Sequence, residues 1–241
     1  MQAKGCYVCF LDSDDYWHPE FLERCTKTIE RSKEEVAFVY VSTVYVKNGT
    51  DLGLAHKSKR SECAILPNIL IRGRPWDTAA CLWDKKVLDK HEGWIFTRNW
   101  EDYAFDISAA LINNRILAIN EPLLYVETGG DNRLSEQDRS IIETEKSKSL
   151  ANISLNLRNS EYHSNSVIKN RVVLHLVNNT IALLDLKGIE QKYIDANIKS
   201  LKLWKPFVFV IFIKLLTWIP IKFGLPLLRR TKMNVQKNHD V

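Results

Sequence analysis

One change of pattern near residue 127 constrains the fold of this chain more than any other feature of its sequence. Before it, apolar runs typical of strands alternate with helical periodicity, and after it only helical patterns follow. Strands are expected at residues 5–11, 36–46, 79–83, 115–119 and 123–126. Helices are expected at residues 18–33, 85–90, 100–113, 135–157, 167–186 and 189–203. The sequence therefore predicts an α/β body, residues 1–130, with a C-terminal α-helical extension, residues 131–203.

The charge of the chain is concentrated in its last part. The net charge is +5, yet residues 191–241 alone carry +8, which leaves −3 for the rest. A slightly acidic body with a basic tail favours contact with an anionic surface through one end. This distribution argues against a groove-binding nucleic-acid protein, and we expect no nucleic-acid partner.

Three carboxylates follow the first expected strand within four residues: Asp12, Asp14 and Asp15. Their mutual repulsion raises their pKa values unless a cation or hydrogen-bond donors compensate. A hard divalent ion, held by one or two carboxylates together with phosphate oxygens, suits such a cluster. The alternative is a solvated acidic turn in which Asp15 caps the following helix.

The segment around these carboxylates, GCYVCFLDSDDYWHPEFLE at residues 5–23, closely resembles the family 2 glycosyltransferases. Their A-type fold carries an apolar strand, a DxD-like motif, an aromatic residue, a proline and a helix. The resemblance implies a partial A-type glycosyltransferase sheet, that is, a Rossmann-like nucleotide-diphospho-sugar transferase sheet, in residues 1–130. It implies that Asp12 and Asp14 bind a nucleotide-sugar donor and that Asp14 and Asp15 hold Mg²⁺ or Mn²⁺. The ion would neutralise the diphosphate leaving group.

A second stretch is similar to the acceptor half of the same family: RPWDTAACLW at 74–83, Gly93-Trp94, and NWEDY at 99–103. The resemblance implies that Asp102 is the general base for the acceptor hydroxyl, with Glu101 beside it. Trp76 and Trp100 would add sugar-stacking surface in the acceptor cleft. The alternatives are that both acids only complement the helix dipole and that each tryptophan belongs to the core.

Members of this family carry further strands before the DxD-like motif, whereas here Asp12 is the twelfth residue. We therefore expect the N-terminal nucleotide-binding strands to be missing. The function expected from the resemblance is transfer of a sugar from a nucleotide-sugar to a hydroxyl acceptor, with inversion, in glycan or polysaccharide assembly. One alternative is a catalytically inactive fragment or subunit of such an enzyme. Another is a haloacid-dehalogenase-type phosphatase, with Asp12 as nucleophile and Asp14 as acid.

The tail at residues 204–241 is both basic and apolar. Its segment FVFVIFIKLLTWIPI, residues 207–221, would span roughly 22 Å as a helix, short of the roughly 30 Å hydrocarbon core of a bilayer. Trp204, Trp218 and several Lys and Arg residues lie near it, which is typical of a segment in the membrane surface. We expect a cytoplasmic protein, peripheral on the inner face of the cytoplasmic membrane, that acts on a glycan or lipid-linked acceptor. The alternative is that this segment packs on the body.

Overall fold

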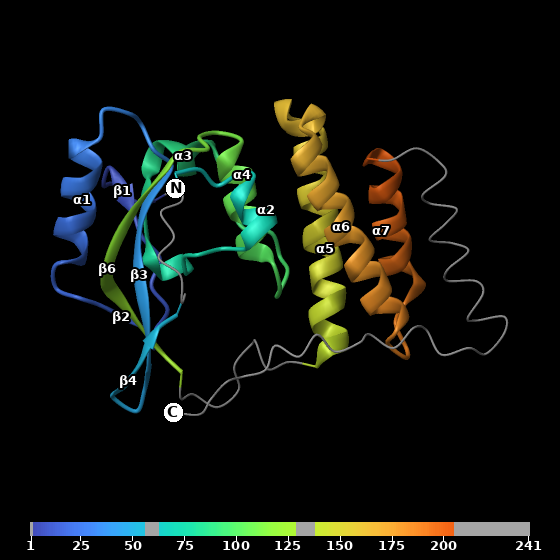
Figure 1. Ribbon diagram of the computed structural model, residues 1–241, viewed down its shortest axis with the longest axis horizontal. Coiled ribbons are helices and arrows are strands. Elements are labelled where there is room, and N and C mark those ends of the chain that lie inside the picture. Colours follow the sequence, from blue (N-terminus) through green and yellow to red (C-terminus); the bar gives the residue numbers. More distant parts are fainter. Residues whose placement is uncertain (1, 56–62, 129–137, 205–241) are drawn as a thin grey trace.

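The computed structural model describes residues 2–55, 63–128 and 138–204, and in these residues a mixed α/β sheet is followed by helices (Figure 1). The expected boundary at residue 130 and the expected membrane segment, residues 207–221, lie outside the described residues. In the described part, no helix is long and apolar enough to cross a membrane.

The sheet has the strand order β1-β5-β3-β6-β2, and β4 pairs with the outer part of β3. Its strands are β1 (Tyr7–Val8), β2 (Tyr16–Trp17), β3 (Phe38–Lys47), β4 (Thr50–Leu54), β5 (Cys81–Asp84) and β6 (Ile116–Glu127). The central pair, β3 with β6, is parallel, and the other pairs are antiparallel.

Strand β3 is buried on both faces of the sheet because its alternating residues enter two different cores. Phe38 and Tyr40 pack with the tryptophans and the helices on one face, whereas Val39 and Val41 pack on the other. β-Branched and aromatic residues fit such a doubly covered strand.

Helices cover both faces of this sheet (Figure 1). The short ones are α1 (Phe21–Arg31), α2 (Asn68–Arg72), α3 (Lys85–Lys90) and α4 (Glu101–Ala110), with 3₁₀ turns η1 (Thr78–Ala80) and η3 (Glu161–Ser164). The long ones are α5 (Arg139–Arg158), α6 (Ser166–Leu184) and α7 (Gln191–Trp204). Helix α1 lies on one face, α2 and α4 lie on the other, and α5 to α7 form a bundle beyond α4.

All six helices expected from the sequence are present, but three strand predictions are wrong in detail. The run at 5–11 gives only the two-residue edge strand β1, which is half-buried rather than buried. Residues 50–54, where no strand is expected, form strand β4, since Asn48-Gly49 turns the chain back onto β3. The two strands expected at 115–119 and 123–126 are one strand, β6.

Trp204 is also not the interfacial residue that the sequence suggested. It is 3% exposed, inside the bundle, and its Nε1 donates to Oγ of Ser154 at 2.7 Å. A tryptophan whose N–H is satisfied in the core has no polar end left for the membrane surface.

Candidate functional site

The three carboxylates after β1 lie in a tight turn that divides them between solvent and protein. The N–H of Asp15 donates to the carbonyl of Asp12 at 3.2 Å, and Asp12 and Asp14 are exposed. Asp15 turns inward, and its Oδ1 accepts a hydrogen bond from the backbone N–H of Glu127, at the end of β6, at 3.3 Å. Asp15 does not cap α1, because the N-cap residue of that helix is Glu20.

The carboxyl of Asp15 experiences strong repulsion in this position. Burial first, and then the charges of Asp12 and Asp14, raise the pKa of Asp15 from 3.8 to about 6, although the bond from Glu127 opposes the rise. The charge of Asp77, from the loop before β5, adds to the effect. The negative charges of Asp12, Asp14 and Asp77 therefore all act on the carboxyl of Asp15, and this negative potential favours a cation.

This cluster can contribute to a metal site but does not complete one by itself. Among the described residues, no group of three or more His, Cys, Asp or Glu side chains is placed to hold an ion. Mg²⁺ is commonly bound through one or two carboxylates while phosphates and water fill its other positions. The exposed Asp14 and the crowded Asp15 fit that donor set.

A buried arginine joins the first turn of α4 to the loop before β5. The side chain of Arg74 is 9% exposed; its Nε lies 2.7 Å from Oδ2 of Asp106, and its Nη1 donates to Oδ2 of Asp102. Burial alone would lower the pKa of Arg74, but the carboxylates of Asp106 and Asp102 raise it above its ordinary value. Arg74 is therefore a fixed cation behind Asp102.

Asp102 remains partly open to solvent although it is paired with Arg74. Its side chain is 29% exposed, and its Oδ1 accepts from the N–H of Tyr103 at 2.8 Å. A carboxylate oxygen has two lone pairs, so each oxygen of Asp102 can accept one more hydrogen bond.

The loop that carries Arg74 brings the two predicted halves of the site together. Nη2 of Arg74 lies 3.1 Å from Oγ1 of Thr78, and the neighbouring Asp77 is the residue whose charge acts on Asp15. The indole N–H of Trp17 donates to the carbonyl of Ala79 at 2.8 Å, which fixes the same loop to β2. Residues 74–80 are thus bonded to Asp102 through Arg74 and to β2, which directly follows the acidic turn, through Trp17.

Glu101 lies next to Asp102 in a less polar setting. Its Oε2 is buried and has no hydrogen-bond partner among the described residues. Burial, with the nearby charge of Asp102, raises the pKa of Glu101. Glu101 is thus easier to protonate than an ordinary glutamate.

The structure contradicts the prediction that Trp76 offers a sugar-stacking surface. Trp76 is 1% exposed, packs against Phe38 and Tyr40, and donates from Nε1 to Oδ2 of Asp106 at 2.8 Å. Both faces of its ring are therefore occupied by the core, and no sugar can stack on it.

Trp100 is partly exposed but already has aromatic and cationic neighbours. It adopts a left-handed conformation, with φ of 63°, and its ring stacks on Tyr103 with centroids 4.5 Å apart. Nζ of Lys146, from α5, lies 4.4 Å from the ring centroid, and His175, from α6, makes an edge contact. Trp100 therefore connects the α/β body to the helical bundle.

Sequence reasoning missed Arg74 and Asp106, which hold Asp102 in place. A signal was available, because Asp102 and Asp106 are four residues apart on an expected helix and share one face. Two acids on a partly buried face need a common cation.

The comparisons with known proteins identify the first part of the chain. The family model described as "Glycosyl transferase family 2" matches residues 1–83. This range includes the acidic turn and the loop with Arg74, and it ends before α4 with Asp102. No curated protein matches the chain.

Proposed function

From the match of residues 1–83 to the model of glycosyl transferase family 2, we propose that the chain transfers a sugar from a nucleotide-sugar donor to a hydroxyl acceptor. The observation that carries the proposal is the loop at residues 74–80, which is bonded to Asp102 through Arg74 and to β2, next to the acidic turn, through Trp17. A haloacid-dehalogenase-type phosphatase would require a different family, and the match argues against it.

The acidic turn is the proposed donor site. Asp12 and Asp14 would contact the nucleotide-sugar, and Asp14 and Asp15 would hold Mg²⁺ or Mn²⁺. The ion would supply charge neutralisation for the diphosphate. The raised pKa of Asp15, about 6, supports this assignment, because a bound cation relieves the repulsion that raises it.

Asp102 is the proposed general base. The acceptor oxygen attacks the anomeric carbon, its proton passes to a carboxylate oxygen of Asp102, and the bond to the diphosphate breaks with its electron pair on the leaving oxygen. Direct displacement of this kind inverts the anomeric centre. Arg74 fixes the orientation of Asp102, and Glu101 is its neighbour.

The acceptor is proposed as a glycan or a lipid-linked glycan at the inner face of the cytoplasmic membrane. The support is the sequence of the tail, in which basic residues flank an apolar segment that contains Trp218.

A thermal-shift titration tests the donor site. The chain is titrated with UDP, GDP and dTDP, each with and without Mn²⁺, beside an Asp14→Asn/Asp15→Asn variant. One nucleotide is expected to stabilise the wild type only with Mn²⁺, by about 2.7 kcal/mol at a hundred times its Kd. The double variant should lose this shift.

An Asp89→Asn/Asp195→Asn variant is the matched control, because it removes two carboxylates from α3 and α7 and should keep the shift. Asp102→Asn should also keep the shift while losing sugar transfer. If no nucleotide shifts a cooperatively melting wild type, donor binding by this chain is refuted and the non-catalytic alternative is favoured.

A further inference from the structure

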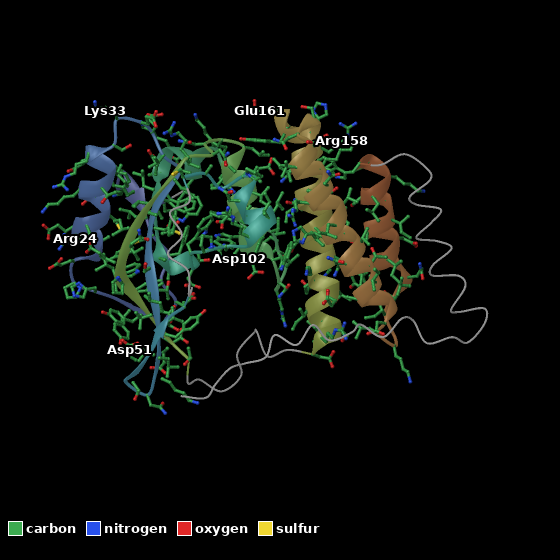
Figure 2. The ribbon with its side chains drawn as sticks, in the orientation of Figure 1. Arg24, Lys33, Asp51, Asp102, Arg158 and Glu161 are labelled. Atoms are coloured by element: carbon green, nitrogen blue, oxygen red, sulfur yellow. The ribbon has the colours of Figure 1, made fainter. Side chains whose placement is uncertain are left out.

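The helical bundle contains a pocket at the end opposite the start of α5. It has a volume of about 220 Å³, and four segments meet there: the last turn of α5, η3, the first turn of α6 and the last turn of α7. The lining residues are Arg158, His163, Ser164, Lys169, Leu203 and Trp204. Figure 2 labels Arg158 at this end of the bundle and Asp102 in the α/β body, and the pocket shares no residue with the site around the acidic turn.

The lining of this pocket is cationic. Arg158 and Lys169 carry full positive charges, His163 can carry one, and no carboxylate is among the lining residues. Glu161 lies at the same end of the bundle, but it does not line the pocket.

Some cations elsewhere in the described residues are paired with an acid. Arg24, Lys86 and Lys148 each make an ion pair with a glutamate. In the described ranges, neither Arg158 nor Lys169 has a carboxylate within 4.0 Å. Two unpaired charges at one concavity leave a local excess of positive potential that favours an anion.

The remaining walls suggest the size and shape of that anion. Trp204 and Leu203 form the apolar part of the lining, and the N–H of Trp204 is already bonded to Ser154. Sites for drug-sized molecules usually occupy about 300–1,000 Å³, so this pocket suits a smaller group. The hydroxyl of Ser164 donates to the carbonyl of Glu161 at 3.4 Å, so the donors for an anion are the arginine fork and the lysine, which together match a tetrahedral phosphate.

We propose that this pocket binds a phosphate group, either of a soluble phosphate compound or of a lipid headgroup. The charged residues would hold the phosphate oxygens, and Leu203 and Trp204 would cover the carbon atoms attached to it. The proposal goes beyond sugar transfer and does not depend on it.

Calorimetric titration of the full chain with inorganic phosphate, in a buffer that is otherwise free of phosphate, tests whether the pocket binds the phosphate group that both sources carry. The Arg158→Gln/Lys169→Gln variant should bind phosphate about tenfold more weakly or worse. The matched control is Arg139→Gln/Lys187→Gln, which removes one Arg and one Lys from the other end of the bundle and should bind as the wild type does. Equal weakening in both variants would mean a diffuse charge effect and would overturn the proposal.

Co-sedimentation with vesicles distinguishes the two sources. If the pocket takes a headgroup, binding to phosphatidic acid vesicles should fall about tenfold in the pocket variant and not in the control. If it takes a soluble phosphate, the two variants should bind vesicles equally while only the pocket variant loses inorganic phosphate. The proposal is overturned if the wild type and the pocket variant bind inorganic phosphate equally well and also bind the vesicles equally well.

Discussion

Nε of Arg74 lies 2.7 Å from Oδ2 of Asp106, whose side chain is 1% exposed. Asp106 also accepts the indole N–H of Trp76, and Arg74 extends from this buried pair to the more exposed Asp102. Burial raises the pKa of Asp106, and the charge of Arg74 opposes that rise. The proposed base is therefore supported by a charged group that the core itself holds.

Removing this guanidinium should destabilise the protein strongly. We expect Arg74→Gln to lower the free energy of unfolding by about 3–5 kcal/mol, because it leaves Asp106 as a buried charge without its cation. Urea denaturation measures the change. Arg24→Gln is a matched control, since Arg24 likewise faces two carboxylates, of Glu20 and Glu121, but at half-exposed positions. This substitution should lower the free energy of unfolding by about 0–1 kcal/mol. Equal losses in the two variants would contradict a buried pair.

Removing a carboxylate from the acidic turn should stabilise the protein. With a folded-state pKa of about 6, above the ordinary 3.8, Asp15 is ionised at pH 7 only at a cost to the folded state. In metal-free buffer at neutral pH we expect Asp15→Asn to raise the free energy of unfolding by about 1 kcal/mol, a value reduced for solvent screening. Thermal melts measure the gain. The exposed control Glu92→Gln should leave the melting temperature unchanged, and a less stable Asp15→Asn would show that the repulsion is overestimated.

His175 should make the protein less stable in mild acid. Burial lowers its pKa below 6.5, and Lys146 and Arg171 add to this, although its bond to the carbonyl of Leu70 opposes it. Below pH 6.5 the unfolded chain gains a proton on His175 while the folded protein resists it. Stability is therefore complete above that pH and falls as the pH approaches the folded-state pKa.

The measurement is the free energy of unfolding at about pH 7.5 and about pH 5.5, where an ordinary histidine changes its charge. His175→Gln should lose less stability on acidification than the wild type does. His163→Gln, at an exposed position, should follow the wild type. An acid sensitivity that persists fully in His175→Gln would assign the effect to other groups.

The hydrogen bond between Trp204 and Ser154 can be measured with a double-mutant cycle. We expect Trp204→Phe and Ser154→Ala each to destabilise the bundle and the double variant to cost less than their sum, with a coupling of about 1 kcal/mol. Additive losses in denaturant unfolding would contradict the buried position of Trp204.

Periodicity predicted β3 and the helix that presents Asp102, but it did not predict β2, the strand that follows the acidic turn. It could not predict their partners. Glu121-Pro122 was interpreted as a break between two strands, yet β6 continues because the ladder with β3 shifts register at Ser42 opposite Pro122. Trp76 shows the same limit, because its residue type suits a sugar platform and a core equally well. Only its position between β3 and Asp106 decides between the two.

The parallel ladder of β3 with β6 also determines the order in which the protein can assemble during synthesis. Strand β3 lacks its central neighbour until the ribosome has released β6, and the bond that orients Asp15 joins residues 112 positions apart. Contacts of such long range form slowly, whereas the bundle of α5, α6 and α7 is built from neighbours in sequence. We therefore expect the acidic turn to be among the last parts of the body to reach its final position, although it is among the first to be synthesised.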